Sequence, residues 1–240
     1  MGLLKGIKGT NKVEQTVEDD RLGGQQLFNS DVYLATIKGA YLDKSSGGSL
    51  GAFLSFEIDG KQLRYTQYIT NKQGENFYTK DGKNFMMMGY LAIDALMQLV
   101  AECPLEDAVT EDKIVKIWDN DLKKEVPQTR EVFVDLLDKQ VKVAVLRQIV
   151  DVTKKGDDGK YHPNGETKEE NECVKFFHAE TDQTLKEAME GIEGGVFMQS
   201  WIEKFKDQIP NKAKGVQGGT TGGKPATAGG ERKPSLFNKK

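Results

Sequence analysis

An aromatic and basic stretch stands out in a chain that is acidic overall. Between positions 61 and 85, five rings are interleaved with five cations, and only Glu75 and Asp81 oppose them. The rings are Tyr65, Tyr68, Phe77, Tyr78 and Phe85, and the cations are Lys61, Arg64, Lys72, Lys80 and Lys83. Cations attract the phosphates of a nucleic acid without reading its sequence, and exposed rings stack on unpaired bases. These residue types therefore predict a site for single-stranded nucleic acid.

Strand parity decides which of these side chains face outward. In KQLRYTQYIT (61–70), alternation places Arg64 and Tyr68 on the polar face and Tyr65 on the apolar face. Phe53 lies on the polar face of the preceding strand and adds another ring. The predicted nucleic-acid-binding residues are Phe53, Lys61, Arg64, Tyr68, Lys72, Phe77, Tyr78, Lys80 and Lys83. An ordinary meander, with rings packed inward and lysines solvated, fits the same residues equally well.

The charge of the chain is unevenly distributed. The 240 residues carry a net charge of −3, but the segment 207–240 carries +5 and the remainder −8. Nucleic-acid binding would therefore depend on a local patch rather than on a basic domain. No apolar run approaches the roughly 20 residues needed to span a bilayer, and the start lacks the apolar core of a signal peptide. We expect a cytoplasmic protein with no membrane partner.

Motifs that would indicate catalysis are incomplete or missing. The segment GGTTGGKPAT (218–227) approaches a phosphate loop, but Pro225 stands where a Mg²⁺-binding hydroxyl is needed. No nucleophile elbow occurs, and no dinucleotide fingerprint lies between a strand and a helix. The cysteines and histidines are Cys103, His162, Cys173 and His178, without the paired short spacings of zinc sites. We therefore expect a non-enzymatic protein without a cofactor or metal.

Hydrophobic periodicity predicts a β-rich chain. Period-two alternation predicts three consecutive strands at 32–44, 49–58 and 61–70, joined by tight turns. A loop is expected at 71–84 and a helix at 85–102. Its three consecutive methionines are assigned to the core, with an adaptable binding face as the alternative. Later in the chain we expect strands at 114–119, 141–155 and 174–180, a polar loop at 161–172, and helices at 181–191 and 197–206, whereas 131–139 is ambiguous.

This order of elements has a precedent among small barrels. A helix between the third and fourth of about five strands is the plan of an OB barrel, which binds oligonucleotides on its second and third strands. We predict a mainly β fold with inserted helices (α+β), an OB-like barrel core and C-terminal helices. The expected divisions are a loosely ordered arm (1–30), a single-strand-binding domain (31–206) and a disordered basic tail (207–240). The tail composition cannot bury enough apolar surface to fold.

The end of the tail has the composition of a short binding motif. The last residues read KPSLFNKK, with Leu236 and Phe237 standing among cations. The predicted partner-binding residues of the tail are Leu236, Phe237, Lys239 and Lys240. An unremarkable chain terminus is the alternative.

Several blocks, in order along the chain, resemble one protein family. They are GLLKGIK, IKGAYLDKSSGG, NFYTKDGKNFMMMGY, VAVLRQIVD and NGETKEENECVKFFHAET, and the closing NKAKG is followed by a Gly/Lys-rich tail. Together they cover nearly the whole chain, and their order and spacing carry the likeness rather than any single motif. The sequence resembles the single-stranded-DNA-binding proteins of lytic podophages, of the group that carries a virion RNA polymerase.

The resemblance implies a protein that coats and protects exposed strands in phage DNA replication and recombination and that assists transcription. It also implies the cytoplasm of an infected bacterial host. The basic tip Asn238-Lys239-Lys240 departs from the acidic tips known in other single-strand-binding proteins, so a partner that recognises an acidic tip is in doubt. Such a tail would instead contact DNA or an acidic surface on a phage or host polymerase. The alternative function is therefore a polymerase-recruiting adaptor that acts through the tail.

Overall fold

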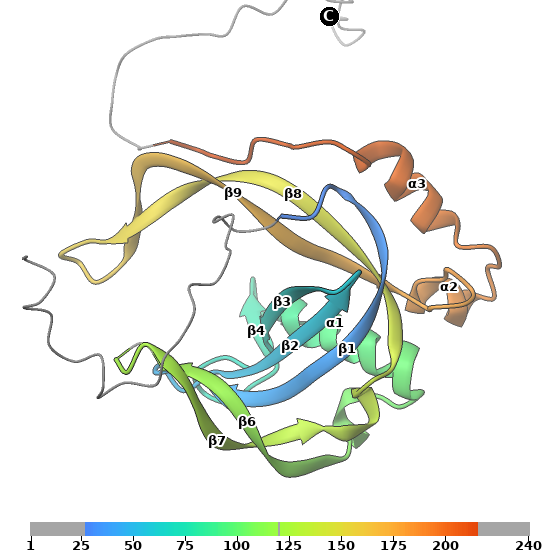
Figure 1. Ribbon diagram of the computed structural model, residues 1–240, viewed down its shortest axis with the longest axis horizontal. Coiled ribbons are helices and arrows are strands. Elements are labelled where there is room, and N and C mark those ends of the chain that lie inside the picture. The colour runs from blue at the N-terminus through green and yellow to red at the C-terminus, as the bar shows by residue number, and fades with distance from the viewer. Residues whose placement is uncertain (1–26, 120, 216–240) are drawn as a thin grey trace, which may run out of the picture.

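The computed structural model describes residues 27–119 and 121–215 (Figure 1). The predicted arm lies outside this range except for its last four residues. The predicted binding residues of the tail, Leu236, Phe237, Lys239 and Lys240, also lie outside the described residues.

One long strand, β1 (Asp31–Lys44), organises the main sheet (Figure 1). Its second half pairs antiparallel with β2 (Leu50–Ile58), and β2 pairs with β3 (Lys61–Tyr68). The other edge of β1 pairs with β8 (Gln140–Lys155) through its first half and with β7 (Lys124–Phe133) at Tyr41. A register shift between Ile37 and Gly39 marks an irregularity that bends the strand. The bend lets β1 join both halves of a strongly curved sheet.

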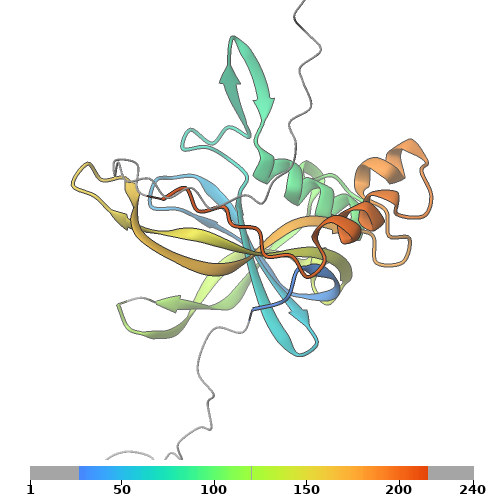
Figure 2. The same ribbon diagram turned by 90° about the horizontal axis from the view of Figure 1, so that it is seen from above.

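Two long hairpins extend this sheet. β6 (Thr110–Asp119) pairs with β7, and β9 (Tyr161–Phe177) pairs with β8. Both hairpins project toward the same side of the molecule (Figures 1 and 2). The order β3-β2-β1-β8-β9 therefore forms the curved body, with β6–β7 attached to β1.

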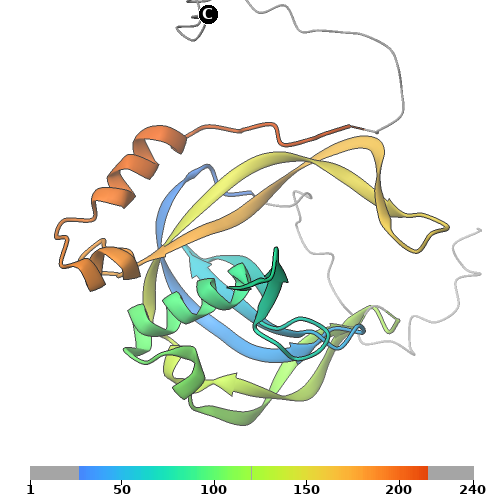
Figure 3. The ribbon, with the colours of Figure 1, turned by 180° about the vertical axis from the view of Figure 1, so that it is seen from behind.

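The core fills the concave side of the sheet. Alternate residues of β2 and β8 point inward, and Phe56, Val143 and Val145 are fully buried there. The helix α1 (Met88–Ala101) follows β3 and a short hairpin, and it packs against β3 and β9 (Figure 3). Its buried residues Ile93 and Leu96 recur at helical spacing. The helix thus covers the opening between the first and last strands of the body.

Two further helices follow β9. They are α2 (Leu185–Glu190) and α3 (Val196–Phe205), and short 3₁₀ turns lie at Leu105–Asp107 and Val134–Leu136. α2 contacts α1, and α3 packs on the outer side of β8. Met198 and Trp201 pack with Ala144, Leu146 and Phe177 in a second apolar cluster. After α3, residues 207–215 run beside β8, where the Ile149 N–H donates to the Pro210 carbonyl and the Lys212 N–H donates to the Ile149 carbonyl. The prediction of a disordered tail from residue 207 is therefore wrong for these nine residues, because they bond to β8. The chain is therefore mainly β with a few helices, as the sequence predicted.

Most predicted elements are confirmed, but three further assignments are wrong. The expected loop 71–84 contains a hairpin of β4 (Phe77–Lys80) and β5 (Lys83–Met86), whose four-residue strands are too short for a clear alternation. The expected polar loop 161–172 belongs to β9, which is polar because this end of the β8–β9 ribbon is exposed on both faces. Met86 and Met88 are 41% and 76% exposed rather than in the core. The ambiguous segment 131–139 ends β7 and forms a 3₁₀ turn.

A buried carboxylate, Glu187, connects α2 to α3. It forms a capping box in which the Thr184 N–H donates to the carboxylate at 2.8 Å and the Glu187 N–H donates to the Thr184 hydroxyl. The Phe197 N–H also donates to the carboxylate, at 2.6 Å. Burial raises the pKa of Glu187, but these hydrogen bonds and the charge of Lys175 outweigh it, and the net pKa lies below its usual value.

Replacing Glu187 with Gln is expected to lower the free energy of unfolding at neutral pH by about 1–3 kcal/mol. Because the folded-state pKa is lowered, the stabilisation is present above the unfolded pKa and is lost as pH falls through the folded pKa. Urea unfolding at neutral and acid pH should therefore show a smaller acid loss in the variant. Glu193→Gln, at an exposed position, is the control. An unchanged acid profile in Glu187→Gln would contradict this role.

Candidate nucleic-acid interface

Three rings lie together on the outward side of β1, β2 and β3. Tyr41 and Phe53 are register partners, and their rings stack with centroids 5.3 Å apart and planes within 8°. Gly51 is the register partner of Tyr68. A Cβ on Gly51 would lie 3.1 Å from the Phe53 ring and 3.3 Å from the Tyr68 ring, so both rings lean over the glycine. Tyr41, Phe53 and Tyr68 therefore form one continuous surface, which we call the ring face.

The β6–β7 hairpin adds a wall beside the ring face. A groove of about 370 Å³ lies between them, lined by Tyr41 and Phe53 on one side and by Lys116 and Trp118 on the other. Trp118 is 51% exposed, which leaves its indole accessible. Arg64 also lines this groove, which we call the ring groove. Rings and cations thus line one groove.

Arg64 is positioned by polar contacts across β2 and β3. Its Nε donates to the Gln62 side chain at 3.3 Å, and the Gln62 amide donates to the Ser55 hydroxyl at 2.8 Å. The guanidinium remains exposed. Because neither contact is an ion pair, the charge of Arg64 is not neutralised by a carboxylate there. Arg64 can therefore hold a phosphate beside the rings.

A second groove continues from Arg64 toward β9. It has a volume of about 640 Å³ and is lined by Lys61, Arg64 and Lys168, among other residues. Among the described residues, β3 and β9 each have one unpaired edge, and this edge groove lies between them. Lys168 pairs with Glu170 at 3.0 Å, which lowers the contribution of Lys168 to phosphate attraction. The cationic path therefore runs from the ring groove across β3.

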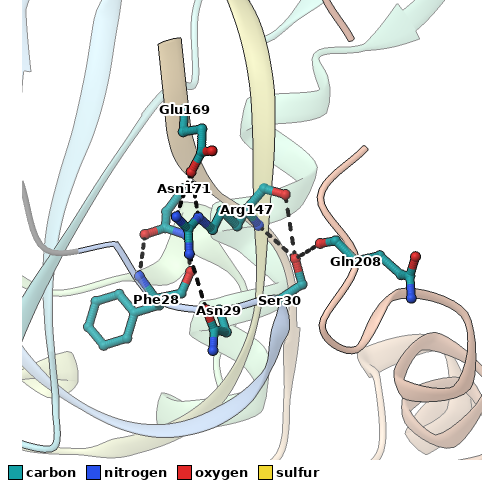
Figure 4. A network of polar contacts seen from close by, with 7 residues as sticks. All are labelled: Phe28, Asn29, Ser30, Arg147, Glu169, Asn171 and Gln208. Carbon is teal, nitrogen blue, oxygen red and sulfur yellow. Dashed lines mark hydrogen bonds and ion pairs between the residues drawn. The ribbon is translucent and has the colours of Figure 1, made fainter. Parts of the chain in front are cut away.

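A polar network fixes the far wall of the edge groove (Figure 4). The Asn171 side chain accepts from the Phe28 N–H and donates to its carbonyl, each at 2.8 Å. Arg147 pairs with Glu169 at 2.6 Å, and the Ser30 hydroxyl accepts from the Arg147 N–H at 2.9 Å. The chain before β1 is thereby fastened to β8 and β9. Arg147 is engaged in this network and is not among the cations that we assign to the interface.

The predicted binding residues fall in more than one place. Phe53, Arg64 and Tyr68 share the outward side of the sheet, and Lys61 lies in the edge groove. Lys72 follows β3 and lies beside the β1–β2 turn at Gly47. The remaining four are Phe77, Tyr78, Lys80 and Lys83, and they belong to the β4–β5 hairpin. The continuous aromatic–basic stretch of the sequence is therefore divided by the fold.

The β4–β5 hairpin stands apart from the body as a separate two-stranded sheet (Figure 2). Tyr78 and Phe85 are register partners and stack with centroids 5.7 Å apart. Lys80 and Lys83 face each other at the tip. The hairpin thus carries its own ring pair and two cations at a distance from the ring face.

Electrostatics at the ring face are mixed. Burial raises the pKa of the Tyr41 hydroxyl, as does Asp43, while Arg130 and Arg64 act in the opposite direction. Arg130 pairs with Asp43 at 3.1 Å, so this cation is partly neutralised. Glu125 also lines the ring groove. Phosphate attraction therefore depends mainly on Arg64 and Lys116 and should be moderate.

Parity assigned Tyr65 to the core, and this is confirmed. Its ring packs edge-on against Phe176, with centroids 5.6 Å apart, and burial raises the pKa of its hydroxyl. Tyr41, Lys116 and Trp118 were not predicted. The alternation of Ile114, Lys116 and Trp118 on one face of β6 was a usable signal, but their proximity to β2 depends on how the hairpin folds back.

The chain matches no protein-family model, and no curated protein matches it. Within residues 27–119 and 121–215, no helix has the length and apolar character to cross a bilayer.

Proposed function

We propose that this chain is a sequence-tolerant single-stranded-DNA-binding protein that coats and protects exposed strands. The observation that carries the proposal is the ring face, with Arg64 and Lys116 beside it in the ring groove. Stacking on every accessible ring favours unpaired bases over a duplex, whose bases are already stacked. Exposed cations supply phosphate contacts without base recognition.

We further propose that the curved body is an OB-like barrel. The order β3-β2-β1-β8-β9 and the helix α1 between β3 and the later strands support this assignment. In that fold the second and third strands carry the binding face, and Phe53, Arg64 and Tyr68 lie on β2 and β3. The likeness of fold is an analogy and adds to the argument from the residues.

A biological role in phage DNA replication, recombination and transcription is proposed on the sequence resemblance. A coating protein needs affinity for any sequence, and stacking rings and exposed cations supply affinity without reading base edges. The adaptor alternative places the main activity in the tail instead. The two proposals differ in whether variants of the ring face abolish strand binding.

Fluorescence anisotropy of a labelled oligo-dT and its duplex, over a salt series, tests the proposal. Full-length protein should prefer the single strand, and the affinity should fall with rising salt because phosphates are contacted. The double variant Arg64→Ala/Tyr68→Ala should bind the strand much more weakly. Equal affinity for strand and duplex, or full affinity in the double variant, would favour the adaptor.

The β4–β5 hairpin is expected to contact only long strands, since it stands apart from the ring face. The double variant Lys80→Ala/Lys83→Ala should leave binding of an oligo-dT of about 8 nucleotides unchanged, because one OB barrel covers about 4–16. With a strand of about 30 nucleotides, loss of two phosphate contacts should reduce the salt slope by about 1.4. If the double variant binds the short oligo-dT with a changed affinity, this placement of the hairpin is wrong.

A further inference from the structure

A third groove lies at the end of the body next to the β1–β2 turn and combines an apolar floor with an acidic rim. Its volume is about 500 Å³. Leu42, Leu50, Ile69 and Phe133 contribute from β1, β2, β7 and the segment after β3, and the residues that line the groove also include Tyr90 of α1. The floor therefore offers an apolar surface on which large apolar side chains can pack.

Three glutamates lie around this floor. Glu75, Glu106 and Glu131 all line the groove, and all three are exposed. None of them takes part in an ion pair among the described residues. Glu75 accepts a hydrogen bond from the Asn71 side chain at 2.8 Å, which orients it without neutralising it. The groove thus suits an apolar segment flanked by cations.

The chain itself contains such a segment. In residues 216–240 there are five Lys or Arg and one Glu, and the end reads RKPSLFNKK. Leu236 and Phe237 are the only large apolar side chains among its last nine residues, and they stand between Arg232-Lys233 and Lys239-Lys240. Apolar anchors and flanking charges of this tail are complementary to the floor and rim of the groove.

The tail is long enough to reach the groove. Twenty residues separate Gly215 from Leu236, which allows a span of up to about 65–70 Å. A domain of about 190 residues has a radius of gyration of about 16 Å. Attachment within one chain also raises the effective concentration of the motif to the millimolar range.

We propose that the acid-rimmed groove binds the C-terminal segment 232–240 of the same chain, with Leu236 and Phe237 on the apolar floor and the basic residues beside Glu75, Glu106 and Glu131. The proposal stands independently of strand binding, because the ring groove and this groove have no lining residue in common. The N-terminal arm is a poorer candidate, because its acidic run Glu18-Asp19-Asp20 has the same sign as the rim.

Photo-crosslinking in the full-length protein tests this proposal. With benzoylphenylalanine placed at position 237, crosslinks should map to the peptides around 69–76, 104–110 and 131–133, within single molecules and independently of protein concentration. The triple variant Glu75→Gln/Glu106→Gln/Glu131→Gln should lower the yield at least several-fold. The control Glu57→Gln/Glu180→Gln/Glu203→Gln removes three exposed glutamates elsewhere and should leave it unchanged.

Three outcomes would overturn the proposal. Crosslinks spread over the surface would show that the tail has no site. Crosslinks found only between two molecules would assign the groove to a neighbouring copy. A yield that is equal in the rim variant and in the control variant would exclude the acidic rim. Placing the crosslinker at Leu4 instead provides a comparison, and capture of that position by the groove would assign it to the N-terminal arm.

Discussion

Replacing Phe53 with Ala is expected to weaken binding of a single strand by about 5- to 150-fold. Stacking of a base on an aromatic side chain contributes about 1–3 kcal/mol, and each 1.4 kcal/mol corresponds to about a tenfold change in affinity. Phe53 is the central ring of the ring face, since it stacks on Tyr41 and lies over Gly51 beside Tyr68. Its loss removes one stacking surface and leaves the Tyr41 and Tyr68 rings without the ring that packs between them. Anisotropy of labelled oligo-dT at fixed salt measures the effect.

A matched control is an exposed ring on another surface. Phe197, at the start of α3, is 47% exposed, and the Lys175 ammonium lies over its ring, 5.9 Å from the centroid, away from the ring groove. Phe197→Ala should leave strand affinity unchanged while urea unfolding reports any loss of stability. Equal affinity in Phe53→Ala and the wild-type protein would remove the ring face from the binding site.

Replacing Gly89 with Ala is expected to lower the free energy of unfolding by about 1–3 kcal/mol or more. A Cβ at this position would lie 2.2 Å from the backbone carbonyl oxygen of Tyr68. Since the contact is with backbone on β3, relief requires α1 to move away from the sheet. The helix lies in the core through Ile93 and Leu96, so movement disturbs packing. Urea denaturation measures the loss.

The same substitution should also weaken strand binding, because Tyr68 is part of the ring face. Gly47→Ala is the control: the nearest atom to its Cβ would be in the flexible end of Lys72, at 3.3 Å, so the substitution should cost little stability. A Gly89→Ala protein as stable as the Gly47→Ala protein would show that α1 does not pack on β3 as described.

The body of the fold was predictable because its strands alternate regularly. Leu54, Phe56 and Ile58 are buried as the period of two requires, and Tyr65 follows the same rule. α1 was visible as a helix from the spacing of Leu91, Leu96 and Leu99, but its buried face was only partly predicted. Leu91 is 43% exposed, whereas Ile93 and Met97, which were not part of the predicted pattern, are fully buried. The alternation of a strand reports which of its faces is buried, and that is a local property of the sequence.

What escaped prediction depends on long-range geometry. β9 was missed in its first twelve residues because a ribbon exposed on both faces has no apolar side. Trp118 and Lys116 come close to Phe53 only because β7 pairs with β1 and brings β6 with it. The stretch 61–85 looked like one site, yet the turn after Tyr68 sends Phe77–Lys83 into a separate hairpin. Spacing along the chain could not separate the residues of the ring face from those of the hairpin.

Tryptophan fluorescence gives the most direct test of the central claim that a single strand lies in the ring groove. The chain has two tryptophans; Trp118 lines the groove, and Trp201 is 5% exposed in the second apolar cluster. In a Trp201→Phe protein, adding oligo-dT should quench the emission of Trp118 and saturate together with the anisotropy of the strand. Trp118→Phe should show no such quenching. If oligo-dT binds to saturation while the emission of Trp118 stays unchanged, the DNA lies elsewhere, and the central claim is contradicted.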